Sequence, residues 1–191
     1  MWLELVIDTF RRPREAARRL LALDLGADTV VQGALAVTSA GIVMTHIAGQ
    51  MAGTTLDPLT AALLTNPLLA ALVQLALLML SVLLTWKIGR LFGGQGGVEG
   101  AFRAIVWLNA VLLILQAAQL LVLGVAPALA VMISVLGMGW LLWAFASFTA
   151  ELHGFRNVFA VAAASVTTGL VVLFGLMTLL VIAGVNPQVI G

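Results

Sequence analysis

The sequence contains no cysteine, and charged residues make up only 9% of it. Without cysteine, disulfides, iron–sulfur clusters, thiol-linked haem and thiolate nucleophiles are excluded, which removes many classes of redox enzyme. No charged residue falls at the middle of a long apolar run, where ionisable groups would mark an ion or proton pathway. We therefore expect no cofactor and no catalytic residue.

Apolar side chains dominate what remains. Hydrophobic residues form 62% of the 191 residues, and the mean hydropathy is +1.16, so the polar surface is too small to cover a water-soluble globule. A helix of about 20 mostly apolar residues crosses the hydrocarbon core of a bilayer. The predicted fold class is all-α, a polytopic bundle of five transmembrane helices at about residues 28–47, 67–88, 101–123, 128–149 and 158–185. These spans form a membrane domain of residues 27–191, preceded by amphipathic interfacial helices in residues 1–26.

The nine Lys and Arg residues all fall on one side of the membrane in this arrangement. They are Arg11, Arg12, Arg14, Arg18, Arg19, Lys87, Arg90, Arg103 and Arg156. Short loops rich in Lys and Arg stay in the cytoplasm, so we predict a cytoplasmic N-terminus and a periplasmic C-terminus. The abundance of Ala, Leu, Val and Gly is typical of a bacterial inner-membrane protein. With a net charge of only +1 and no basic tail, no nucleic-acid partner is expected.

The first residues have the pattern of an amphipathic helix that lies in the membrane interface. On a helix, Leu3, Val6 and Phe10 share one face, and Glu4 and Asp8 share the opposite one. A proline at position 13 suits the first turn of a second helix. No secretory signal is expected, because the arginines follow this apolar stretch. The nine cations are predicted to contact lipid headgroups, at roughly 1 kcal/mol per basic residue, or else a protein partner.

Polar side chains recur at helical spacing within the predicted spans. In lipid, side chains that can form hydrogen bonds are more stable when they face another helix than when they face the acyl chains. We therefore predict a set of polar residues in the bundle interior, comprising Gln32, Gln74, Ser81, Asn109, Gln116 and Gln119. Interhelical hydrogen bonds are the expected role of these residues, and a substrate pathway is the alternative.

No metal or catalytic site is indicated. His46 and His153 fall at opposite ends of the predicted spans, and neither has a second histidine at the spacing of a zinc motif. Glu99 and Arg103 are four residues apart and can pair along one helix. The glycine-rich run at 93–97 joins two helices without a strand, so a flexible turn explains it better than a nucleotide-binding loop.

The order of several short segments resembles the bacterial branch of the YIP family, the Ypt-interacting membrane proteins. These segments are Phe10 to Pro13, the loop Gly93 to Gly97 before Ala101 to Arg103, and Trp143 to Phe155. The resemblance extends over nearly the full length of the chain. It implies a five-span membrane fold without catalytic residues. Eukaryotic members are described as binding Rab GTPases and acting in vesicle traffic and membrane shaping.

The predicted function is that of a non-enzymatic integral membrane protein with a membrane-organising or accessory role. Two alternatives remain open: a small subunit of a larger respiratory, photosynthetic or transport complex, and a transporter. Membrane lipids are the expected partners, with a protein partner at the cytoplasmic face or the bundle side as a second interpretation. Small residues at Gly33, Gly41, Ser165 and Gly169 allow close helix packing, and leave room for a homo-oligomer.

Overall fold

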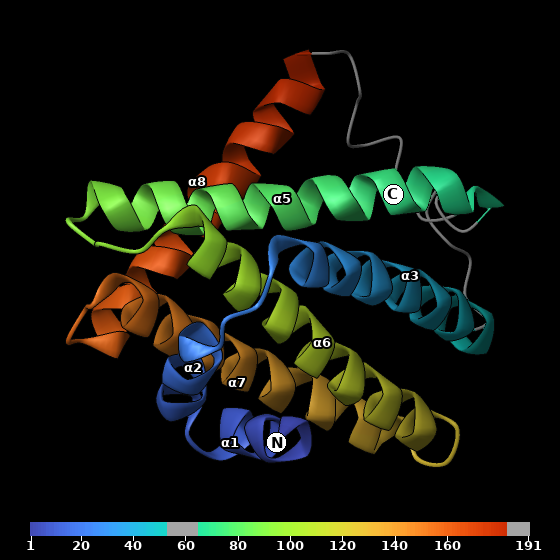
Figure 1. The fold of residues 1–191 in the computed structure, drawn as a ribbon. Coiled ribbons are helices and arrows are strands. Elements are labelled where there is room, and N and C mark those ends of the chain that lie inside the picture. The colour runs from blue at the N-terminus through green and yellow to red at the C-terminus, as the bar shows by residue number, and fades with distance from the viewer. Residues whose placement is uncertain (53–64, 183–191) are drawn as a thin grey trace.

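The computed structural model describes residues 1–52 and 65–182, and every regular element in these ranges is a helix (Figure 1). The helices are α1 (Trp2–Arg11), α2 (Pro13–Ala22), α3 (Ala27–Ala52), α5 (Pro67–Leu91), α6 (Val98–Leu123), α7 (Pro127–His153) and α8 (Val158–Ile182). Five of them, α3, α5, α6, α7 and α8, are long and apolar enough to cross a membrane. The predicted all-α, five-helix membrane fold is confirmed. The last residues of the predicted fifth span, 183–185, lie outside the described residues.

Proline and short polar side chains set several helix ends. Pro13, Pro67 and Pro127 each occupy the first turn of a helix, where the missing N–H would have had no partner. The Asn66 side chain caps α5 by accepting a hydrogen bond from the backbone N–H of Leu69 at 3.1 Å. At the other end of α7, Gly154 adopts the left-handed conformation, with φ at 75°, that glycine adopts without steric cost.

The long helix α6 lies at the centre of the packing, against α3, α5 and α7. One buried cluster joins α3, α5 and α6 and includes Val37, Val82 and Ile105. A second cluster joins α1 and α2 to α6 and α7 and includes Leu20, Leu108 and Phe148. The first turns of the last helix, α8, pack against the end of α7 around Ala150 and Val161. From there α8 runs at a steep angle to the other long helices (Figure 1). The two N-terminal helices therefore share a core with the bundle.

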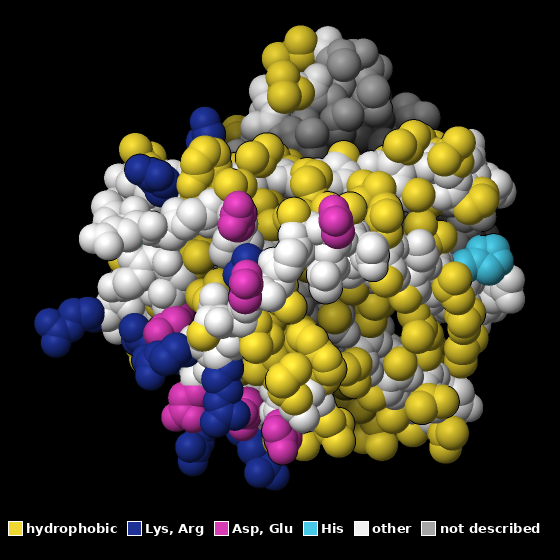
Figure 2. Space-filling model, in the orientation of Figure 1, with side chains coloured by type: hydrophobic (Ala, Val, Ile, Leu, Met, Phe, Trp, Pro, Cys, Tyr) yellow, Lys and Arg dark blue, Asp and Glu magenta, His cyan; other side chains and the backbone are white. Residues whose placement is uncertain are grey.

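The basic side chains gather at one end of the bundle, seen on the left of Figure 2. We call this end the charged end. It contains α2, the turn between α5 and α6, the last turn of α7 and residues 154–157. The turn and α7 are in direct contact, because the backbone N–H of Gln95 donates to the carbonyl of His153 at 3.3 Å.

Candidate functional site at the charged end

The helices α1 and α2, which we call the cap, are fixed to the bundle by ion pairs between distant parts of the sequence. The Arg14 Nε and the Arg18 Nε each donate to one carboxylate oxygen of Glu151, both at 2.9 Å. Arg14 also donates to the backbone carbonyls of Phe155 at 2.8 Å and Arg156 at 3.2 Å. A carboxylate in the last turn of a helix opposes the helix dipole, so the two arginines explain the position of Glu151.

The charge on this cluster is stable. Glu151 accepts a hydrogen bond from Arg18 and attracts its positive charge, and both effects raise the pKa of the Arg18 guanidinium above its already high value. The side chain of Glu151 is 17% exposed, whereas that of Arg18 is 69% exposed. The carboxylate is therefore the fixed part of the pair.

Arg103 fixes the chain between the cap and α3. Its two terminal nitrogens donate to the backbone carbonyls of Leu23 at 2.9 Å and Leu25 at 3.0 Å. The expected pair with Glu99 is present at 4.0 Å, but Glu99 is largely exposed. Arg103 therefore acts mainly as a clamp on the backbone after α2, which its spacing from Glu99 did not indicate.

Two tryptophans of the bundle hold α1. The Trp107 Nε1 donates to the Thr9 hydroxyl at 3.0 Å, and the Trp140 Nε1 donates to the backbone carbonyl of Phe10 at 3.3 Å. The rings of Phe10 and Trp140 stack with centroids 4.5 Å apart. These bonds come from α6 and α7, so α1 is fixed to the membrane-spanning part of the bundle as well as to α2.

The orientation of α1 differs from the simple division into an apolar and a charged face. Leu5 and Thr9 form its buried side, at 5% and 0% exposure. Leu3 and Ile7, four residues apart on another side of the helix, are 72% and 42% exposed. The apolar surface of α1 is thus divided between one strip on the bundle and one free strip, a division that the sequence pattern did not reveal.

His153 is enclosed by glycines at the charged end and is only 3% exposed. Its Nδ1 accepts a hydrogen bond from the backbone N–H of Gly96 at 3.2 Å. Its Nε2 lies 3.1 Å from the backbone carbonyl of Thr85. A donor on one nitrogen and an acceptor on the other fit the neutral ring protonated at Nε2. His153 is therefore a structural link between α5, the glycine-rich turn and α7.

Three glycines surround this ring. A Cβ atom added to Gly89 would overlap the ring, and one added to Gly96 would lie 2.7 Å from the Leu152 side chain and 2.8 Å from His153 Nδ1. A Cβ atom added to Gly94 would also come too close to the His153 ring, at 2.5 Å from its Nδ1. The run at 93–97 was predicted to be a flexible turn, but Gly94 and Gly96 are buried against α7.

The predicted lipid-contacting or partner-contacting cations fall into two groups. Five form ion pairs with acids: Arg12 with Glu15, Arg14 and Arg18 with Glu151, Arg19 with Asp8, and Arg103 with Glu99. The other four have no acidic partner within residues 1–52 and 65–182: Arg11, Lys87, Arg90 and Arg156. Contact of these nine side chains with lipid or a partner stays a prediction, but Arg14 and Arg103 also donate to backbone carbonyls, which the sequence did not indicate.

The predicted interior polar residues are not all inside the bundle. Gln32 and Ser81 are exposed, and the Ser81 hydroxyl donates to the Leu77 carbonyl of its own helix at 2.8 Å, so the structure does not bury these two side chains. A serine can satisfy its hydroxyl on its own backbone and therefore needs no neighbouring helix.

The remaining four of these residues are half-buried. The Gln119 Nε2 donates to the Ser134 hydroxyl of α7 at 2.5 Å, an interhelical bond of the kind expected. The Gln74 amide lies against Gly41 of α3 so closely that a Cβ atom there would overlap it. The Asn109 Nδ2 donates within α6, to the Ile105 carbonyl at 2.9 Å, and Gln116 lies on the same helix.

In the part of the chain that the structure describes, no group of three His, Asp or Glu side chains is arranged to hold a metal ion.

Five apolar helices of membrane-spanning length, with cations gathered at one end, define a multi-pass membrane protein. A family model described as the Yip1 domain matches residues 7–179. The chain therefore belongs to the Yip1 family, which confirms the resemblance seen in the sequence. No curated protein and no solved structure matches the chain.

Proposed function

We propose that this protein is a non-enzymatic organiser of the bacterial inner membrane, and that the cap is the part that acts on the cytoplasmic leaflet. The observation that carries this proposal is the free apolar strip of Leu3 and Ile7 on a helix that is otherwise fixed to the bundle. A short amphipathic helix acts on a bilayer by burying its apolar face about 5–10 Å into the boundary between headgroups and acyl chains.

The position of α1 supports insertion at that depth. Trp107 lies four residues beyond Arg103 along α6, and Trp140 lies eleven residues before Glu151 along α7. At about 1.5 Å per residue, the bonds to α1 are therefore roughly 6 to 16 Å further along the bundle than the bonds to α2 and to the backbone that follows it. Figure 1 shows that α1 runs across α6 and α7 rather than along them. Such a helix would lie in the plane of the membrane, below the level of the arginines.

Attachment to the bundle keeps α1 permanently at one position, unlike a free amphipathic peptide. A free peptide loses orientational freedom when it enters the interface, and it can leave again. Here the bonds from Trp107 and Trp140 hold α1 itself, and the ion pairs of Arg14 and Arg18 with Glu151 hold the adjoining α2. The proposed mechanism is a permanent wedge in one leaflet, which would displace headgroups and favour a curved bilayer.

Vesicle shape tests this proposal. We expect the full chain, reconstituted at high density into vesicles of phosphatidylethanolamine and phosphatidylglycerol, to give smaller vesicles or tubules than protein-free lipid. The double variant Leu3→Ser/Ile7→Ser should lose most of this effect, because the two side chains contribute about 3 kcal/mol of apolar burial in the interface. Vesicle diameters measured by electron cryo-microscopy provide the readout.

Glu4→Ser is the matched control, because Glu4 lies on α1 with its side chain 78% exposed and forms only an ion pair with the N-terminal amine. Equal diameters for the double variant and wild type would contradict the wedge.

Native mass measurement after gentle detergent extraction distinguishes the organiser from the alternative that the protein is a small subunit of a larger complex. A fixed stoichiometric protein partner would favour that alternative, and a chain or homo-oligomer carrying lipid would favour the organiser.

A further inference from the structure

A groove opens between α5 and α8 on the side of the bundle away from the cap. Its volume is about 680 Å³, within the range of about 300–1,000 Å³ found for small-molecule sites. The groove is mainly apolar, with small side chains on α8 such as Ala160 and Ala164 and aromatic rings of Phe92, Phe145 and Phe155 around it. It forms because the first turns of α8 pack against the end of α7 and leave the neighbouring face of α5 uncovered.

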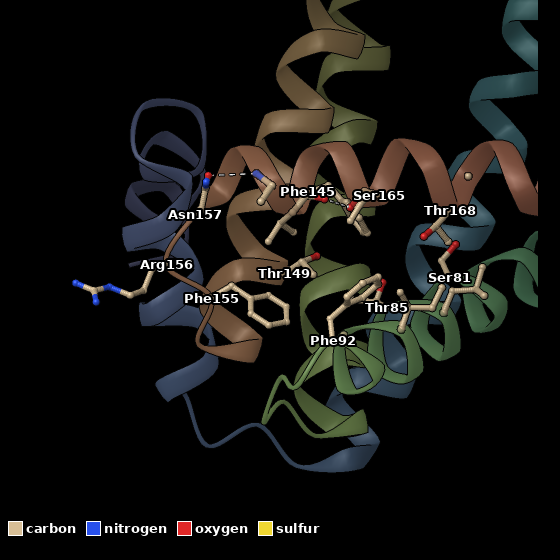
Figure 3. Close-up of a pocket in the computed structure, with 17 residues that line it drawn as sticks. Ser81, Thr85, Phe92, Phe145, Thr149, Phe155, Arg156, Asn157, Ser165 and Thr168 are labelled. Carbon is tan, nitrogen blue, oxygen red and sulfur yellow. Dashed lines mark hydrogen bonds between the residues drawn. The ribbon is translucent and has the colours of Figure 1, made fainter.

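Figure 3 shows how the groove is built. Ser81 and Thr85 on α5 face Ser165 and Thr168 on α8, and Thr149 on α7 lies between the two walls. The hydroxyl of Ser165 donates to a carbonyl of its own helix, that of Val161, at 2.8 Å. A helix hydroxyl that is satisfied in this way adds little polarity to the wall, so the interior suits an apolar occupant.

The charge of the groove lies at its end. Arg156 borders it at the charged end, and its guanidinium extends outward, away from the opening (Figure 3). The carbonyl of Arg156 is held by Arg14 at 3.2 Å, so the backbone is fixed while the side chain is exposed. None of the described residues that line the groove is acidic. The occupant therefore needs an apolar part inside and a negative charge outside the opening.

The length of the groove selects the occupant. Its lining runs from Ser81 to Gly89 on α5 and from Ala160 to Gly169 on α8, which is about 12 Å and about 14 Å along the two helices. One leaflet of the hydrocarbon core is about 15 Å thick, half of the roughly 30 Å of the whole core. An acyl chain of one leaflet matches this length, whereas a transmembrane helix of a second copy would require contact over both leaflets.

We propose that the groove binds one acyl chain of an anionic phospholipid from the leaflet at the charged end, with the lipid phosphate beside Arg156. This site lies on α5, α7 and α8 and does not depend on the proposed role of the cap. The lipid fills the space between α5 and α8 and so holds α8 against the bundle. The unpaired cations Lys87 and Arg90 lie at the same end of α5 and add to the attraction for anionic headgroups.

Native mass spectrometry of the full chain in mild detergent tests the site with two lipids, dioleoyl-phosphatidylglycerol and dioleoyl-phosphatidylcholine. We expect tighter binding of phosphatidylglycerol, and about tenfold weaker binding of it by Arg156→Ala, because a charge-assisted contact with the phosphate is lost. Binding of phosphatidylcholine should change less. Ala164→Phe should reduce the binding of both lipids by filling the groove, and glycerol phosphate, which has no acyl chain, should not compete.

Arg90→Ala is the matched control, because it removes the same charge at the same end of the bundle outside the groove lining. Equal losses for Arg156→Ala and Arg90→Ala would overturn the site and leave only general electrostatic attraction. A dimer mass that Ala164→Phe abolishes without loss of lipid would identify a second copy of the chain as the occupant and also overturn it. Wild-type chain with a photoreactive acyl chain on phosphatidylglycerol gives a test that needs no variant: crosslinks on α5 and α8 support the proposal, and crosslinks elsewhere refute it.

Discussion

Glu151→Ala is expected to release the cap from the bundle and to lower its docking stability by about 2 kcal/mol. The carboxylate accepts from both Arg14 and Arg18, and its removal leaves the partly buried Arg14 guanidinium with only the two backbone carbonyls. A loss of this size raises the undocked population by up to about thirtyfold. Limited trypsin cleavage within residues 11–19 of the detergent-solubilised chain measures it, because cleavage requires undocking.

Glu15→Ala is the control for this prediction. It removes one acid from the same arginine-rich region, but Glu15 pairs only with Arg12, at 3.4 Å, and both side chains are more than half exposed. Such surface pairs contribute about 0–1 kcal/mol. If both variants were cleaved at the same rate, the ion pairs to Glu151 would not be what holds the cap.

Gly89→Ala is expected to lower the free energy of unfolding of the bundle by about 2 kcal/mol. In a helix interior, replacing glycine by alanine normally stabilises by about 1 kcal/mol, so the predicted sign is opposite to helix propensity. The reason is the His153 ring, which would overlap the new Cβ atom and is fixed by bonds to Gly96 and Thr85. Overpacking of this kind costs about 1–3 kcal/mol. Unfolding in mixed detergent micelles, followed by circular dichroism, measures the change.

Gly137→Ala in α7 separates the gain in helix propensity from the cost of overlap with a neighbouring side chain, because a Cβ atom at that position has nothing within 4 Å. It should leave stability unchanged or raise it slightly. The effect of Gly89→Ala should shrink in a His153→Ala background, since residues in contact are not additive. A stabilising effect of Gly89→Ala in the wild-type background would show that the ring is not fixed.

The spans could be predicted from the sequence because length and apolar composition are local properties. The proline at position 13 predicted a helix start, and the structure places it in the first turn of α2. The polar stripes were less predictable. Helical spacing says which residues share a face, but it does not say whether that face meets another helix, and Gln32 and Ser81 are exposed. Ser81 needs no neighbouring helix, because its hydroxyl donates to the Leu77 carbonyl of its own helix.

The contacts that build the cap could not be predicted in the same way. Arg14 and Glu151 are 137 residues apart, and nothing in either local sequence indicates the pairing. The buried side of α1 was missed because Thr9, a polar residue, belongs to it. Its hydroxyl donates to the Leu5 carbonyl at 2.7 Å and accepts from Trp107, so it is buried without an unsatisfied group. The burial of His153 was also missed. The space for its ring is left by Gly89, Gly94 and Gly96, which are distant from it in the sequence.

Arg14 connects the two proposed lipid-binding regions of the molecule. Its guanidinium binds Glu151 and the carbonyls of Phe155 and Arg156, so it joins the cap to the end of the groove. Residues 155 and 156 form the connection between α7 and α8. A change at Arg14 can therefore alter the position of the Arg156 backbone at the end of the groove.

The depth of α1 in the bilayer is the most direct test of the central claim. Because the chain contains no cysteine, single variants Leu3→Cys, Ile7→Cys and Glu4→Cys each carry one nitroxide spin label in the reconstituted protein. Collision rates with oxygen and with a water-soluble nickel chelate are then compared. We predict that labels at positions 3 and 7 are accessible to oxygen and shielded from nickel, and that the label at position 4 shows the reverse. Nickel accessibility at all three positions would place α1 in water and contradict a helix held in the membrane.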